Sequence, residues 1–62
     1  MSTVYHIDNL NYIARLAATN GNITVVLDML CRGADDYIGI IYNSRIANNL
    51  DVEYTVEEYL YT

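Results

Sequence analysis

The chain has 62 residues and a formal net charge of −5, with three arginines and no lysine against eight acidic residues. A sequence this short predicts one domain, 1–62. Such a domain buries only about 60% of the surface that its unfolded chain exposes, so we expect it to gain further stability by association with a partner or with itself. A single cysteine excludes an internal disulfide and fits a reducing compartment. The sequence shows neither a signal-peptide pattern nor the apolar run of roughly 18 residues that a membrane span needs. We therefore expect a cytoplasmic protein with no membrane span.

The first half of the chain predicts two helices joined by a short turn. Apolar residues recur every three or four positions over 8–19 and again over 22–32. The letters NGN at 20–22 interrupt the pattern, and Gly33 is placed to end the second helix. Helices joined by so short a turn run roughly antiparallel and pack on each other.

Residues 16–35, LAATNGNITVVLDMLCRGAD, resemble an ankyrin repeat. The match consists of Leu16-Ala17-Ala18, a turn at Gly21, the pair Val25-Val26, Met29-Leu30 and the closing Gly33-Ala34-Asp35. The Thr-Pro-Leu-His opening of the family is missing, and there is no second copy, whereas repeat proteins stack about three units. The resemblance therefore implies a helical hairpin, and an adaptor or structural module is one function that it suggests.

The second half predicts two further helices, over 36–50 and 55–61. The spacing of Thr55 and Glu58 matches a capping box, which places the start of the last helix at residue 55. The fold class predicted is therefore all-α, a small domain of four helices. One stripe of the third helix collects its large apolar residues, Ile38, Ile41, Tyr42, Ile46 and Leu50. The predicted core of the whole domain is Ile13, Leu16, Ala17, Val26, Leu27, Leu30, Ile41, Ile46 and Leu50.

An α+β fold with a small antiparallel sheet is the alternative. Its strands would be 3–7, 37–42 and 52–56, because β-branched and aromatic residues are frequent there and apolar residues alternate with polar ones over 52–56. Periodicity alone does not decide between helix and strand in segments this short.

Residues 44–60, SRIANNLDVEYTVEEYL, resemble the core of a helix-turn-helix. The match consists of Ile46-Ala47 and Leu50 on the first helix, Val52 in the turn, and Thr55-Val56 at the start of the recognition helix. The resemblance implies a DNA-binding regulator. Arg45 is the only cation in this segment, however, and binding to duplex DNA relies on Lys and Arg that displace counterions. We therefore expect no direct binding to nucleic acid.

The net negative charge belongs entirely to the second half of the chain. Residues 1–34 carry two carboxylates and two arginines, whereas residues 35–62 carry six carboxylates and one arginine. Five of the seven tyrosines also lie in the second half, and tyrosine is enriched at protein interfaces. We expect one negative face, framed by tyrosines, that binds a partner and comprises Asp35, Asp36, Asp51, Glu53, Tyr54, Glu57, Glu58 and Tyr61.

Residues that carry chemistry are few. His6 is the only histidine, the Cys and His ligands of a zinc site are too few, and no glycine-rich phosphate loop is present. We therefore expect no enzymatic activity, no metal and no cofactor. Cys31 falls on the apolar stripe of the second helix, which predicts a buried structural thiol.

In size, charge and lack of catalytic groups the chain is similar to small acidic inhibitors carried by phages, including anti-CRISPR proteins and DNA mimics. That similarity implies a stoichiometric inhibitor that occupies the basic, nucleic-acid-binding surface of a host complex. A simpler interpretation stays open for Glu57 and Glu58, since carboxylates in the first turn of a helix oppose its dipole and acidic residues promote solubility.

Overall fold

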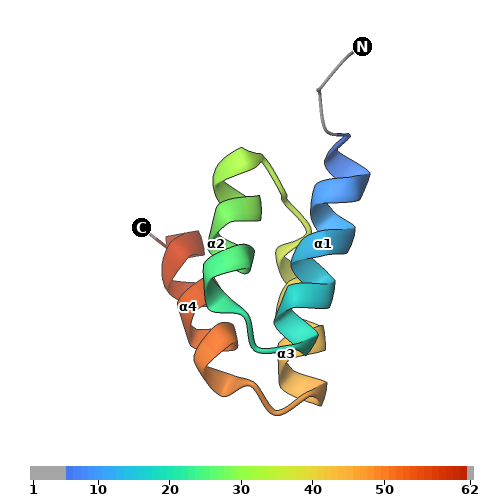
Figure 1. The fold of residues 1–62 in the computed structure, drawn as a ribbon. Helices are drawn as coiled ribbons and strands as arrows, with labels where there is room; N and C mark the ends of the chain where they lie inside the picture. The colour runs from blue at the N-terminus through green and yellow to red at the C-terminus, as the bar shows by residue number, and fades with distance from the viewer. Residues whose placement is uncertain (1–5, 62) are drawn as a thin grey trace.

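The computed structural model describes residues 6–61, and four α-helices account for most of them (Figure 1). The helices are α1 (Ile7–Thr19), α2 (Ile23–Arg32), α3 (Tyr37–Ile46) and α4 (Leu50–Tyr61). The prediction of an all-α fold is confirmed. Two strands of the alternative, 37–42 and 52–56, are helical, and most of the third, 3–7, lies outside the described residues.

The boundary between the third and fourth helices differs from the prediction. The helix expected over 36–50 ends at Ile46, and the last helix begins at Leu50 instead of residue 55. Asn48 makes the turn between them with a φ of 60°, a left-handed conformation in which asparagine is enriched. The apolar spacing continues across this turn, so periodicity does not reveal it.

Thr55 therefore lies inside α4 and does not begin it. Its hydroxyl donates to the carbonyl oxygen of Asp51, one turn earlier, at 2.7 Å. The predicted capping box of Thr55 and Glu58 is wrong, and the acidic residues in the first turn of α4 are Asp51 and Glu53.

Each half of the chain forms a helical hairpin. α1 packs on α2 across the turn at 20–22, where Gly21 has a φ of 74°, and α3 packs on α4. α1 also packs on α3, and α2 on α4 (Figure 1). The order around the bundle is thus α1, α3, α4, α2, and the outer side of α3 lies between α1 and α4. The helical hairpin implied by the ankyrin-like segment is present in α1 and α2.

The core consists mainly of small and β-branched side chains, which let the four short helices approach closely. Of the predicted core residues, Ala17, Val26 and Leu30 are buried, and Ile13, Leu27 and Ile41 are partly buried. Leu16, Ile46 and Leu50 are exposed, so those three predictions are wrong. The other buried apolar residues are Leu10, Ala14, Ala18, Ala34, Ile40, Val52 and Val56.

α3 turns a different side inward from the one that its apolar stripe predicts. Ile40 and Ser44 are fully buried, and the hydroxyl of Ser44 donates to the carbonyl oxygen of Ile41 at 2.7 Å, which satisfies it inside the core. This helix carries apolar residues on nearly every side, so its sequence does not specify which side packs. Three residues of the predicted stripe instead face solvent, with exposed fractions of 84%, 61% and 64% for Ile38, Tyr42 and Ile46, whereas Ile41 is partly buried against the core.

Two asparagines fasten α1 to the second hairpin. The side-chain oxygen of Asn11, in α1, accepts from the backbone N–H groups of residues 35–36 at 2.8 and 3.1 Å. The side-chain amide of Asn49, in the turn before α4, donates to the carbonyl oxygens of residues 18–19 at 3.0 Å each. This second contact gives the carbonyl oxygen of residue 19 a partner, and it adds to the bond that the carbonyl oxygen of Ala18 accepts from the N–H of Gly21 at 3.2 Å.

Candidate partner-binding surface

Each of the three arginines is paired with a carboxylate. The pairs are Arg15 with Asp36 at 2.7 Å, Arg32 with Asp28 at 3.1 Å, and Arg45 with Glu53 at 2.8 Å. Three of the eight carboxylates are thereby compensated, and eight minus three leaves five, which accounts for the net charge of −5. Within residues 6–61, the carboxylates without an ion pair are Asp8, Asp35, Asp51, Glu57 and Glu58.

Glu53 lies at the contact between α3 and α4 and not on an exposed face. It is 8% exposed, and its two carboxylate oxygens accept from Nε and Nη2 of Arg45 at 3.3 and 2.8 Å. Hydrogen bonding from Arg45 lowers the pKa of Glu53, against a smaller opposing effect of burial. The same hydrogen bond raises the pKa of Arg45. Glu53 therefore holds two helices together and is not available to a partner.

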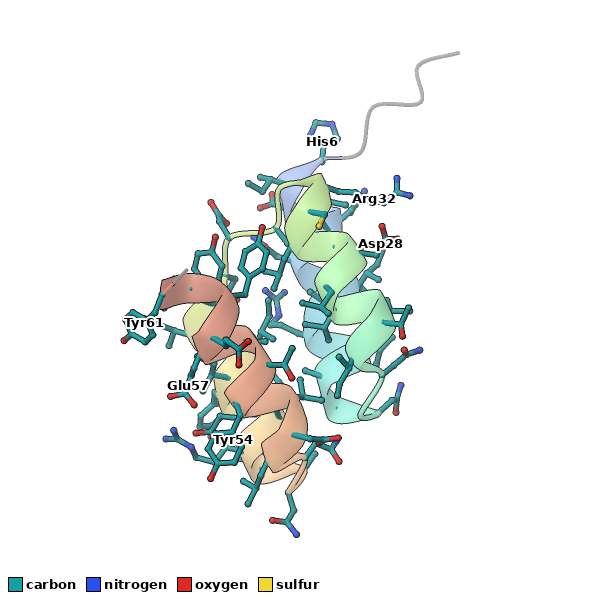
Figure 2. The ribbon with its side chains drawn as sticks, turned by 90° about the vertical axis from the view of Figure 1, so that its left-hand side faces the viewer. His6, Asp28, Arg32, Tyr54, Glu57 and Tyr61 are labelled. Carbon is teal, nitrogen blue, oxygen red and sulfur yellow. The ribbon has the colours of Figure 1, made fainter. Side chains whose placement is uncertain are left out.

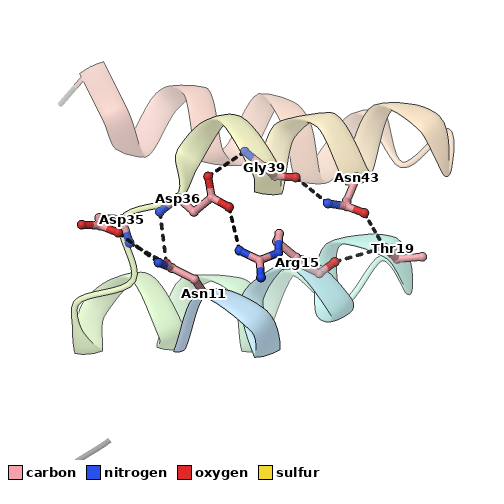
Figure 3. Close-up of polar contacts among 7 residues, drawn as sticks. All are labelled: Asn11, Arg15, Thr19, Asp35, Asp36, Gly39 and Asn43. Carbon is pink, nitrogen blue, oxygen red and sulfur yellow. Dashed lines mark hydrogen bonds and ion pairs between the residues drawn. The ribbon is translucent and has the colours of Figure 1, made fainter. Parts of the chain in front are cut away.

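Asp36 also has a structural role, at the start of α3 (Figure 3). One carboxylate oxygen accepts from the backbone N–H of Gly39 at 3.1 Å and caps the helix, and the other accepts from Arg15 at 2.7 Å. Asp35, beside it, accepts from the side-chain amide of Asn11 at 3.1 Å. Both carboxylates thus belong to the contact between α1 and the loop before α3.

The other five residues of the predicted face lie together on α4. Tyr54 and Tyr61 are 63% and 83% exposed, and Figure 2 shows them in one column with Glu57 along the helix. Asp51 and Glu58 are also exposed. Positions 51, 54, 58 and 61 are spaced by three, four and three residues, which keeps them on the outer side of a helix. We define the α4 surface as Asp51, Tyr54, Glu57, Glu58 and Tyr61.

The α4 surface combines concentrated negative charge with exposed phenol groups. From Asp51 to Glu58 the helix rises about 10 Å, and three uncompensated carboxylates fall within that length. This is of the same order as the charge density along one strand of duplex DNA, about one phosphate per 3.4 Å. The α4 surface can therefore attract cations that are spaced to receive a nucleic-acid backbone.

A second exposed surface was not predicted. The outer side of α3 presents Ile38, Tyr42 and Ile46, which we define as the α3 stripe, and on α1 the neighbouring side chains Tyr12 and Leu16 are 60% and 50% exposed. A groove of about 190 Å³ runs between α1 and α3. The sequence did contain a signal, because α3 has more large apolar residues than one side of a ten-residue helix can bury.

Other chemistry-bearing residues are scattered. Cys31 is exposed, so the predicted buried thiol is wrong, because the inward side of α2 is centred on Val26 and Leu30. His6 is exposed, and no three His, Cys, Asp or Glu side chains in residues 6–61 are grouped to hold a metal ion.

The surface hollows lined by described residues have volumes of about 190 to 240 Å³, smaller than the ~300–1,000 Å³ of typical small-molecule sites. Within the described helices, none has both the length and the apolar character that crossing a bilayer requires.

The segment that resembles a helix-turn-helix has a different geometry from the one that the resemblance implies. Residues 47–49 form the turn, and Val52 lies within α4. α3 and α4 run antiparallel and side by side (Figures 1 and 3), whereas the helices of a DNA-binding helix-turn-helix cross at about 90–120°.

Comparison of the chain with protein-family models, curated proteins and solved structures finds no match.

Proposed function

We propose that the protein is a non-enzymatic inhibitor whose α4 surface occupies a basic, nucleic-acid-binding surface on a partner complex. The observation that carries this proposal is the gathering of three uncompensated carboxylates and two exposed tyrosines on the outer side of one helix. A helix that needed only solubility would not require large exposed phenol rings among its charges.

The carboxylates and the tyrosines would act on different steps of binding. Complementary charge chiefly raises the association rate, and salt screens it with a Debye length of about 8 Å at physiological ionic strength. Tyrosine acts through desolvated contact area and therefore mainly slows dissociation. Exchange of Tyr61 for alanine should thus speed dissociation, whereas loss of carboxylates should slow association.

Direct recognition of DNA by α4 is the less favoured alternative. Arg45 is engaged by Glu53, and the outer side of α4 presents carboxylates that would repel phosphates. A salt-sensitive gel shift of duplex DNA at sub-micromolar protein would nevertheless favour a DNA-binding regulator over an inhibitor.

The test compares two variants that carry the same net charge. Glu57→Gln with Glu58→Gln removes two charges from the α4 surface, and Asp8→Asn with Asp35→Asn removes two charges elsewhere, so both change the net charge from −5 to −3. Each immobilised protein is incubated with a lysate of the organism that carries it. The captured proteins are then identified and challenged with duplex DNA as a competitor.

The proposal expects the wild type to retain nucleic-acid-binding proteins that the competitor DNA releases. The Asp8 and Asp35 variant should retain them equally well, and the Glu57 and Glu58 variant should lose them or capture them more slowly. Capture that DNA does not displace, or equal capture by both variants with the same salt dependence, would overturn it. Glu57 and Glu58 would then be solubilising groups.

A further inference from the structure

We propose that the protein forms a homodimer through the outer side of α3, with the α3 helices of the two copies packed antiparallel. The surface is the α3 stripe, bordered on α1 by Tyr12 and Leu16. This inference goes beyond the proposed function, because it concerns another helix and a second copy of the chain instead of a basic partner.

The exposed apolar area is large for a chain of this size. Together, the α3 stripe, Tyr12 and Leu16 expose the equivalent of about three whole large side chains, or roughly 450–750 Å² if each contributes the ~150–250 Å² typical of an aromatic side chain. The largest apolar patch on a typical monomer is about 300–600 Å². Two such patches would bury roughly 900–1,500 Å² in total, which reaches the lower range of stable interfaces, about 1,200–2,000 Å².

The α3 stripe is also suited to pair with itself. Ile38, Tyr42 and Ile46 form one ridge of residues spaced by four, the ridge that interdigitates when two helices cross at about 50°. The ridge reads the same in both directions, with a tyrosine between two isoleucines. A two-fold axis at Tyr42 therefore sets Tyr42 against its own copy and Ile38 against Ile46 of the second copy, as an isologous interface requires.

Charge favours a second copy over a charged partner at this place. The arginines nearest α3 are neutralised, Arg45 by Glu53 and Arg15 by Asp36, so the outer side of α3 offers little net charge to a basic or an acidic surface. Two uncompensated carboxylates lie near α3: Asp35 directly precedes its N-cap, and the charge of Glu57 raises the pKa of Arg45. Asp51 and Glu58 are on the exposed side of α4, so mutual repulsion between two copies with a charge of −5 is smaller when they meet through α3 than when they meet through α4.

Sedimentation equilibrium over a wide dilution series tests the dimer. The wild type should have twice the 7.1 kDa mass of one chain at high concentration and should dissociate on dilution. Tyr42→Glu places two carboxylates against each other at the two-fold axis and should give a monomer throughout. Thr24→Glu adds the same charge at an exposed position of α2 and should remain a dimer. Far-UV circular dichroism verifies that both variants keep the helical fold.

A charge exchange tests the antiparallel orientation. Ile38→Glu combined with Ile46→Arg brings opposite charges together twice across the axis, so this variant should dimerise, whereas Ile38→Glu combined with Ile46→Glu should not. A wild type that stays monomeric at every concentration overturns the proposal, as does a Tyr42→Glu variant that still dimerises. If both double variants are monomeric, the antiparallel arrangement is wrong. Because Glu57→Gln with Glu58→Gln should leave the dimer intact, failure of the dimer is distinguishable from failure of the α4 surface.

Discussion

Exchange of Gly39 for alanine should destabilise this protein, although the same change inside a helix usually stabilises it by about 1 kcal/mol. Gly39 lies in the first turn of α3, where a Cβ atom would overlap the carboxylate of Asp36. That carboxylate accepts from the N–H of Gly39 at 3.1 Å and from Arg15 at 2.7 Å (Figure 3). The carboxylate must therefore move, and both contacts are lost.

The expected change in unfolding free energy follows from those contacts. Loss of an N-cap costs about 0.5–2 kcal/mol, and loss of an ion pair between partly exposed side chains costs at most about 1 kcal/mol. Against these stands the gain of about 1 kcal/mol in helix propensity. The net effect is a destabilisation of about 0.5–1 kcal/mol, within a range from about 0.5 kcal/mol of stabilisation to about 2 kcal/mol of destabilisation. In a domain of this size, 1 kcal/mol shifts Tm by about 4–8 °C.

The assay is thermal unfolding followed by circular dichroism, on the wild type, Gly39→Ala, Asp36→Ala and the double variant. In the Asp36→Ala background the overlapping carboxylate is absent, so Gly39→Ala should there raise stability by about 1 kcal/mol. The two substitutions should thus be strongly non-additive, and the effect of Gly39→Ala should change sign. If Gly39→Ala stabilises both backgrounds equally, the contact with Asp36 does not constrain this position and the reasoning fails.

Three further predictions concern the core, the ion pair and the thiol. Leu30→Ala should lower the unfolding free energy by about 2–5 kcal/mol because Leu30 is 4% exposed, whereas Leu16→Ala, at a half-exposed site, should lower it much less. Equal losses of unfolding free energy in urea would contradict the burial of Leu30. The pKa of Glu53 is lowered in the folded state, so its ion pair stabilises the fold at pH values above the ordinary carboxyl pKa, and this stabilisation is lost as the pH falls through the lowered pKa. The wild type should therefore lose more unfolding free energy in acid than Glu53→Gln does. Parallel pH profiles of the two proteins would refute this. Cys31 is exposed and should react with an alkylating reagent equally fast in native buffer and in denaturant, and protection in native buffer would show that it is buried.

The first hairpin was predictable because its turns carry local signals. Gly21 and Gly33 both adopt positive φ, at 74° and 118°, and they mark the ends of the first two helices in the sequence. The turn before α4 instead uses Asn48, within a run of residues that also suits a helix. The inward side of α3 was not predictable either, because its choice depends on how neighbouring helices pack and not on its own periodicity.

The candidate site was predictable only in part, for a related reason. Segregation of charge along the sequence located the carboxylates of α4. It did not reveal that Arg15 and Arg45 engage Asp36 and Glu53, which lie 21 and 8 residues away from them along the chain. Such pairs form through tertiary contacts, so the sequence does not show which carboxylates remain uncompensated.

The two asparagine contacts of α1 affect how the chain unfolds. Asn11 belongs to the first hairpin and holds backbone groups that lead into the second, whereas Asn49 belongs to the second and holds the end of the first. Opening either hairpin therefore breaks side-chain hydrogen bonds to the backbone of the other. This reciprocal dependence works against partly unfolded states, so the two halves should open in a single cooperative transition.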